Sequence, residues 1–217
     1  SSDVCSSDLE GYGSYLIPAV MMIIIFQTLL MVIGMVTGEE YSSDGIRTYA
    51  PFGHTWAAAI RIVAGKAFVY CGLYAIFSFF LLGLLPYFFS IPNIGNGLYI
   101  VLLMIPYLIA TSFLGLAASR YFTDSEAPLL MIAFFSVGLI FLSGVSYPME
   151  LMPWYWKAAH YILPAAPATL AFVQLNSMGA SMADIRPEYI TLWIQVLVYF
   201  ILSIWVYQKK LQKSQLR

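Results

Sequence analysis

The chain has 217 residues, of which 61% are hydrophobic and 10% are charged, with a formal net charge of -1. Soluble domains are roughly 45–50% apolar and about 25% charged. The composition therefore excludes an ordinary soluble enzyme or a nucleic-acid-binding domain and indicates an integral membrane protein.

The first nine residues, SSDVCSSDL, are polar and differ in composition from everything that follows. They resemble translated sequencing-adaptor read-through, so we expect residues 1–9 to be a non-native leader outside the fold. A native external tail is the alternative. We then expect a membrane domain over residues 10–210 and a short cytoplasmic tail over residues 211–217.

Five apolar segments reach the roughly 17–25 residues that a helix needs to cross the hydrocarbon core of a bilayer. No Asp, Glu, Lys or Arg occurs at residues 67–119 or 127–149, so these stretches belong in lipid or in a protein interior. The chain is therefore expected to be all-α and polytopic, with five transmembrane helices at residues 15–36, 67–89, 98–118, 127–145 and 189–207.

Residues 38–66, between the first and second spans, are too polar to cross a membrane and too long for a simple turn. From residue 55 onward, apolar residues recur at helical spacing, which predicts an amphipathic coupling helix lying at the inner membrane interface. Ahead of it, Ile46, Tyr49 and Phe52 are expected to form a short exposed apolar knob that a partner binds. A solvated loop with interfacial aromatic residues is the alternative.

The spans hold few polar side chains, and these are uncharged. A transport pathway needs some of them, although hydrogen bonds between helices explain such residues equally well. Gly34 with Gly38, and Gly115 with Ala118, offer small surfaces for close helix approach. The pathway candidates are Gln27, Thr28, Thr111, Ser112 and Ser136.

The stretch FLSGVSYPMELMPWYWK, residues 141–157, is punctuated by glycine and prolines. Apolar runs at residues 154–163 and 167–175 follow, each too short to span a bilayer and too apolar for water. We expect a hairpin of two short helices that dips into the outer leaflet, anchored by aromatic side chains. A plain external loop is the alternative. The hairpin and gate candidates are Gly144, Tyr147, Pro148, Glu150, Pro153, Trp154 and Trp156.

Lys and Arg are distributed unevenly between the two sides of this arrangement. Lys157 and Arg186 fall on one side, and the other eight cations fall on the side of the C-terminus, which predicts a cytoplasmic C-terminus. Five spans then place residue 10 outside, with nothing upstream to carry it across. We therefore expect that a first span, and with it an external domain, is missing from this chain.

Three stretches resemble the type-2 permease group of ABC-type exporters: YLIPAVMMIIIFQTLLMVIGMVTGEE, FLSGVSYPMELMP and ILPAAPATLAFVQLNSMGA. The resemblance covers about residues 12–210. Its strongest part is the pattern of Gly144, Tyr147, Pro148 and Pro153, which in the family marks the outer end of the penultimate span. The spacing of Glu40 and Gly45, and Ile46 in place of a Thr, depart from the coupling pattern of the family.

The resemblance implies a permease of the bacterial inner membrane that works with cytoplasmic ATPase subunits and with a second permease copy or a paralogue. ATP and Mg would be bound by the ATPase, and this chain would hold no cofactor and no metal. The chain agrees, because Gly65 and Lys66 are followed by Ala67, and no phosphate-binding loop motif occurs. The ATPase-coupling residues implied are Glu39, Glu40, Gly45, Ile46, Arg47, Tyr49 and Phe52.

Two rival functions remain open from the sequence. An ion-coupled secondary transporter usually needs ionisable groups within the membrane, and the predicted spans have none. An intramembrane hydrolase could use Ser143 with His160, or Asp124 with Glu126, although Ser143 lacks a glycine-rich nucleophile motif. Drugs, lipids and hydrophobic peptides are about equally suitable substrates, and a hydrophobic or amphipathic cargo is favoured.

Overall fold

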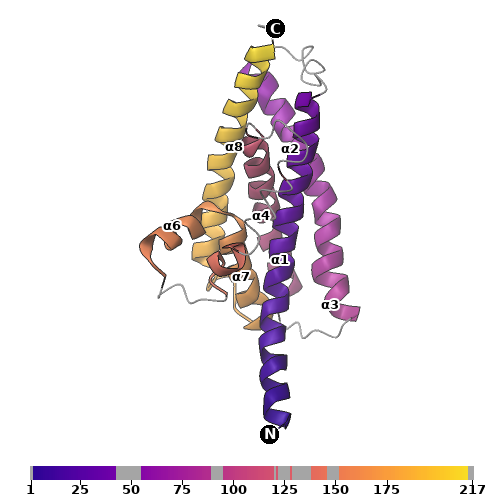
Figure 1. The fold of residues 1–217 in the computed structure, drawn as a ribbon, viewed down its shortest axis with the longest axis vertical. Helices are drawn as coiled ribbons and strands as arrows, with labels where there is room; N and C mark the ends of the chain where they lie inside the picture. Colours follow the sequence, from indigo (N-terminus) through magenta and orange to yellow (C-terminus); the bar gives the residue numbers. More distant parts are fainter. Residues whose placement is uncertain are drawn as a thin grey trace.

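The computed structural model describes residues 2–42, 55–88, 95–119, 121, 128, 138–145 and 152–214. The helices in this part of the chain are α1 (Ser2–Ser42), α2 (Trp56–Phe79), α3 (Leu85–Phe88), α4 (Gly97–Ala118), α6 (Trp154–Ile162), α7 (Ala165–Ser177) and α8 (Arg186–Ser214). A π-helical turn, Phe80–Leu84, joins α2 to α3, and residues 138–142 are also helical. Figure 1 shows α1, α2, α4 and α8 along the long axis, with the two termini at opposite ends.

The expected all-α, polytopic architecture is confirmed. Four described helices are long and apolar enough to cross a membrane, at Leu16–Glu40, Trp56–Phe88, Gly97–Ala118 and Arg186–Gln212. They correspond to four of the five predicted spans. The fifth, at residues 127–145, lies mostly outside the described residues. The backbone of residues 2–9, the expected leader, continues α1.

Helix α4 lies at the centre of the bundle, where it packs against α1, α2, α7 and α8. The buried face of α1 follows helical spacing through Met22, Ile25, Leu29 and Ile33. Gly115 of α4 lies against Ile33, because a Cβ added to this glycine would come within 2.9 Å of Ile33 Cδ1 and 3.1 Å of Cγ2. The close approach expected of Gly115 is therefore confirmed, and it brings α1 and α4 together.

The prediction of a separate interfacial helix from residue 55 is wrong. Residues 56–66 are instead the first turns of α2, which continues without a break into the predicted second span. Trp56–Phe88 is 33 residues long, or about 50 Å at 1.5 Å per residue. A helix of this length exceeds the roughly 30 Å hydrocarbon core, so its polar first turns can extend beyond the membrane without a change of direction.

Helices α6 and α7 confirm the two short helices predicted at this point of the chain. They meet at 87° across a break of a few residues, so they form a corner rather than an antiparallel hairpin. In Figure 1, α6 extends sideways from the bundle and α7 is seen nearly end-on. Upstream, Gly144 follows the helical residues 138–142 with a φ of 79°, a left-handed conformation that glycine adopts without steric cost.

The loop between α7 and α8 ends in a turn stabilised by Asp184. The Asp184 carboxylate accepts hydrogen bonds from the backbone N–H of Ser181, at 2.9 Å, and from its hydroxyl, at 2.8 Å. Both bonds favour the ionised carboxylate and lower the pKa of Asp184 below its ordinary value. The turn therefore keeps its hydrogen bonds at neutral pH and leads directly into α8.

Candidate functional site

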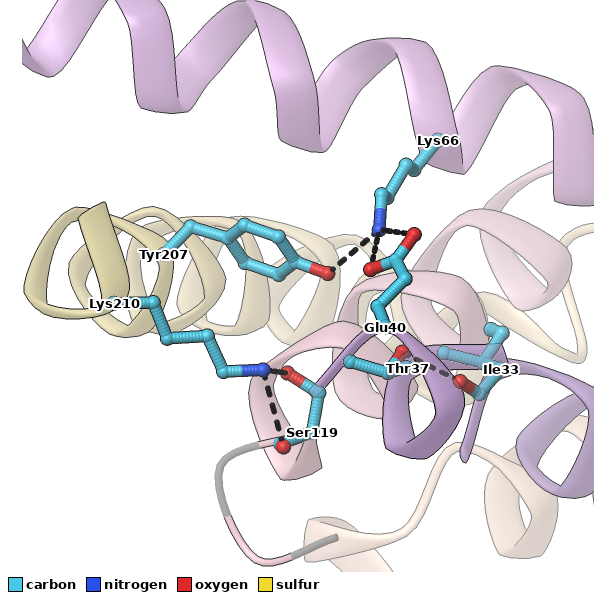
Figure 2. Close-up of polar contacts among 7 residues, drawn as sticks. All are labelled: Ile33, Thr37, Glu40, Lys66, Ser119, Tyr207 and Lys210. Atoms are coloured by element: carbon cyan, nitrogen blue, oxygen red, sulfur yellow. Dashed lines mark hydrogen bonds and ion pairs between the residues drawn. The ribbon is translucent and has the colours of Figure 1, made fainter. Parts of the chain in front are cut away.

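A cluster of charged and polar side chains joins four helices at the end of the bundle that carries the C-terminus. Glu40 of α1 and Lys66 of α2 form an ion pair, with Lys66 Nζ at 2.6 Å from Oε1 and 2.5 Å from Oε2 of Glu40. Lys66 Nζ also donates a longer hydrogen bond of 3.3 Å to the hydroxyl of Tyr207 on α8. Figure 2 shows these three side chains pointing toward one another.

A second lysine completes the cluster at the end of α4. Lys210 Nζ donates to the carbonyl oxygen of Ser119, at 3.2 Å, and to its hydroxyl, at 3.0 Å (Figure 2). Ser119 caps α4, and a cation at a helix C-terminus is favourable because the last carbonyl groups carry partial negative charge. The ring of Tyr207 lies between the two lysines, with its centroid 5.3 Å from Lys66 Nζ and 5.2 Å from Lys210 Nζ.

The Glu40–Lys66 pair closes the base of the predicted coupling segment. Glu40 lies near the end of α1, before the segment, and Lys66 lies three turns into α2, after it. The side chains are only 13% exposed for Lys66 and 23% for Glu40. Water screens such a pair less than a surface pair, so it holds the end of α1 to the first turns of α2.

The predicted coupling residues are only partly within the described chain. Glu39 is exposed and Glu40 is half-buried in the ion pair. The remaining candidates, Gly45, Ile46, Arg47, Tyr49 and Phe52, lie outside the described residues.

Sequence reasoning did not assign Lys66, Tyr207, Lys210 or Ser119 to a site. One signal was present, since Glu40 and Lys66 are charges at the ends of consecutive apolar runs on the same predicted side of the membrane. Charges at such positions tend to pair.

The pathway candidates bond mainly within or between helices. Thr28 donates to the Ile24 carbonyl at 2.7 Å and Thr111 to the Tyr107 carbonyl at 2.8 Å, each one turn back in its own helix. Ser112, which is fully buried, lies 3.4 Å from the sulfur of Cys71 and so links α4 to α2. Gln27 is half-buried on α1, and Ser136 lies outside the described residues.

The gate candidates are divided between described and undescribed residues. Pro153 precedes the first turn of α6, and Trp154 and Trp156 in that turn are exposed, Trp154 by 80%. Gly144 lies in the turn that follows the helical residues 138–142. Tyr147, Pro148 and Glu150 lie outside the described residues, as do Asp124 and Glu126.

Ser143 and His160, the conceivable nucleophile and base, both bond to backbone carbonyl groups. Ser143 Oγ donates to the Ile140 carbonyl at 2.6 Å, and His160 Nδ1 lies 2.8 Å from the Leu142 carbonyl, so that nitrogen carries the proton. A nucleophile must donate its proton to the base, whereas here the Ser143 hydroxyl donates to the backbone carbonyl of Ile140. The His160 bond joins the last turn of α6 to the end of residues 138–142.

Comparisons with known proteins identify a family. A family model described as "ABC-2 family transporter protein" matches residues 2–205. No curated protein and no solved structure matches the chain. Among the described residues, no group of three or more His, Cys, Asp or Glu side chains could hold a metal ion.

Proposed function

This chain belongs to the ABC-2 transporter family, and on that premise we propose that it is the permease subunit of an ATP-driven exporter. The family match over residues 2–205 is the observation that carries the proposal. Two permease subunits, identical or paralogous, enclose a pathway that opens alternately to the two sides. Cytoplasmic ATPase subunits bind ATP and Mg and supply the energy. The pathway takes a hydrophobic or amphipathic substrate, in keeping with its apolar helices.

The end of the bundle that carries the C-terminus faces the cytoplasm of a bacterial cell in this proposal. Arg61, Lys66, Lys209 and Lys210 lie in the helical turns at that end. At the other end the cations of the described residues are Lys157 in α6 and Arg186 at the start of α8. Cytoplasmic ends of membrane helices carry the excess of Lys and Arg, which supports this orientation in the cell membrane.

The segment between α1 and α2 is the docking site for the ATPase in this proposal. Its base is closed by the Glu40–Lys66 pair, and the same lysine reaches Tyr207 of α8. When the ATPase moves this segment, α1 and α2 therefore move first, and α8 follows through its contact at Tyr207. The cluster gives the coupling segment a firm attachment to three spans.

The test is a detergent pull-down of the full-length permease from its native operon. A nucleotide-hydrolysing subunit should come with it and should be lost when residues 45–52 are scrambled. Scrambling residues 178–183, at the opposite end of the bundle, is the control and should leave the ATPase bound. Absence of any ATPase from the intact permease would overturn the proposal, as would transport that continues without ATP and follows an ion gradient instead.

A narrower variant tests the contact itself. Replacing Tyr49 and Phe52 by Asp puts two charges into the proposed apolar knob. Loss of aromatic anchors at an interface typically costs about 2 kcal/mol or more, so binding of the ATPase should weaken by roughly thirtyfold or more. The spans should remain folded by circular dichroism. Unchanged ATPase binding and transport would remove these two residues from the contact.

A further inference from the structure

The carbonyl end of α6 is bonded to two side chains of α8. Gln195 Nε2 donates to the Tyr161 carbonyl at 2.8 Å, and the Tyr199 hydroxyl donates to the Ile162 carbonyl. Gln195 and Tyr199 are four residues apart, on one face of α8, and both side chains are buried. One face of α8 thus supplies donors to two consecutive carbonyl groups.

These carbonyl groups need donors because α6 ends abruptly. The last four carbonyl groups of a helix have no partner within it, and here the chain passes through Leu163 and Pro164 to the 87° corner with α7. Unpaired carbonyl groups in apolar surroundings are costly. The two α8 side chains therefore satisfy carbonyl groups that α6 itself leaves open, and they do so only in one position of α6.

A third bond fixes the same end of α6 from another side. His160, which is fully buried, donates from Nδ1 to the carbonyl of Leu142, at the end of the helical residues 138–142. The opposite end of α6 is exposed through Trp154, Tyr155 and Trp156. Among the helices described above, only α7 packs appreciably against α6. Within the described residues, helix α6 is thus held mainly at its last turn, by polar bonds.

We propose that Gln195, Tyr199 and His160 form a polar latch that positions α6, and that α6 turns about the corner at residues 163–164 when the latch opens. Gln195 and Tyr199 are positioning residues, since they act through the backbone of α6. The role of α6 as a movable outer cover of the pathway rests on the function proposed above. The latch itself can be tested without transport or ATP.

The test measures the distance between α6 and α8 by pulsed electron paramagnetic resonance. Spin labels are placed on cysteines replacing Ala158 and Leu197, both exposed, after the native cysteines of the permease, Cys71 among them, are changed to Ser. The full-length permease is reconstituted in nanodiscs and diluted with unlabelled protein. With the latch intact, we expect one narrow main distance population and a minor population in which α6 is displaced.

Removal of the donors should enlarge the population in which α6 is displaced. Gln195→Met and Tyr199→Phe keep the size of each side chain and delete the donor, so displaced α6 should increase roughly threefold per bond, the factor that matches about 0.6 kcal/mol for a hydrogen bond in a membrane protein. Tyr161→Phe is the matched control, because its carbonyl is the acceptor and its exposed hydroxyl takes no part in the latch.

The outcome decides between a latch and simple packing. A double variant whose distribution equals that of Tyr161→Phe would overturn the latch. Should the double variant fail to assemble, Tyr199→Phe alone keeps the ring and is judged by the same comparison. The two proposals can fail separately. If no ATPase binds the intact permease, the proposed function is overturned, while the distances between α6 and α8 still decide the latch.

Discussion

The side chains at the C-terminal end of the bundle show how charge is tolerated beside lipid. A lone charge at the end of a span is costly unless it reaches water or a partner. Glu40 and Lys66 are both mostly covered, and each has the other as its partner. Tyr207 adds a hydrogen bond and a ring face to Lys66. Each charge is therefore neutralised by a partner within the bundle and is not exposed to the apolar surroundings.

Breaking this pair should destabilise the permease. Removal of one partner of a buried pair costs about 3–5 kcal/mol, and removal from an exposed pair costs about 1 kcal/mol or less. With exposures of 13% and 23%, Lys66→Ala or Glu40→Gln should cost about 1–3 kcal/mol of unfolding free energy, measured by reversible unfolding in mixed micelles. Arg61→Ala, an exposed cation on the same helix, is the control and should change stability by about 0.5 kcal/mol or less.

Exchange of the two charges provides a second check. The double variant Glu40→Lys with Lys66→Glu should regain part of the stability that either single reversal loses, because opposite charges again face each other. If the double variant loses as much unfolding free energy as the two single reversals together, the two side chains contribute independently and the pair does not close the segment.

Packing between α1 and α4 depends on a residue without a side chain. Gly115 lets α4 approach Ile33 so closely that an added Cβ would meet Cγ2 and Cβ of the isoleucine as well as its flexible Cδ1. The whole side chain would have to move. By contrast, a Cβ added at Gly72 of α2 would meet nothing within 4 Å.

Gly115→Ala should therefore be less stable than Gly72→Ala by about 1–3 kcal/mol, the usual cost of overpacking. Comparing two Gly→Ala changes in helices cancels most of the gain in helix propensity. Adding Ile33→Val removes Cδ1, the closest atom, and should recover part of the loss in the same unfolding assay. Equal stabilities of the two glycine variants would show that α1 and α4 do not pack as tightly as this contact requires.

The limits of the helices show what apolar runs can and cannot predict. For α4 the predicted span, 98–118, differs from the observed Gly97–Ala118 by one residue. Asn96 caps its start, where its side chain accepts a hydrogen bond from the N–H of Leu98. For α2 the predicted span begins eleven residues after Trp56, where the helix starts, because the cations Arg61 and Lys66 end an apolar run without ending a helix. Hydropathy marks where lipid ends, and backbone hydrogen bonds continue beyond it.

Part of the candidate site could have been predicted from the sequence, and part could not. Gln195, Tyr199, Ser203 and Tyr207 recur every four residues along the buried face of α8, a polar pattern visible in the sequence that sequence reasoning missed. The partners of this stripe could not be predicted, because the carbonyl groups of Tyr161 and Ile162 become available only where α6 ends and turns. Beyond the 87° corner, α7 packs against α1, a contact between segments far apart in the sequence.

At the scale of the whole molecule, the spans lie side by side and the two ends differ in chemistry. One end carries the lysine cluster and the C-terminus, and toward the other end α6 extends sideways (Figure 1). The sequence predicted this division from the distribution of Lys and Arg alone. Four of the five spans predicted from hydropathy are found in the described residues, in the predicted order, whereas the central place of α4 required the contacts between helices.

The orientation can be measured on intact cells with an impermeant maleimide. In a permease with Cys5 and Cys71 changed to Ser, Met178→Cys should be labelled from outside, and Gln212→Cys only after the membrane is permeabilised. Both positions are exposed and flank the ends of helices, so accessibility within the protein is comparable. Labelling of Gln212→Cys on intact cells would reverse the proposed orientation and place the coupling segment outside.

The π-helical turn Phe80–Leu84 determines the direction in which the side chains that follow it in this span point. Its hydrogen bond from the N–H of Leu85 to the carbonyl of Phe80 encloses one residue more than an α-turn. One extra residue rotates the following side chains by about 100° relative to an unbroken α-helix. Tyr87 and Phe88, both strongly exposed, owe their direction to this insertion. Deleting one residue between 80 and 84 would swing the two rings to another side of the helix with every remaining residue unchanged.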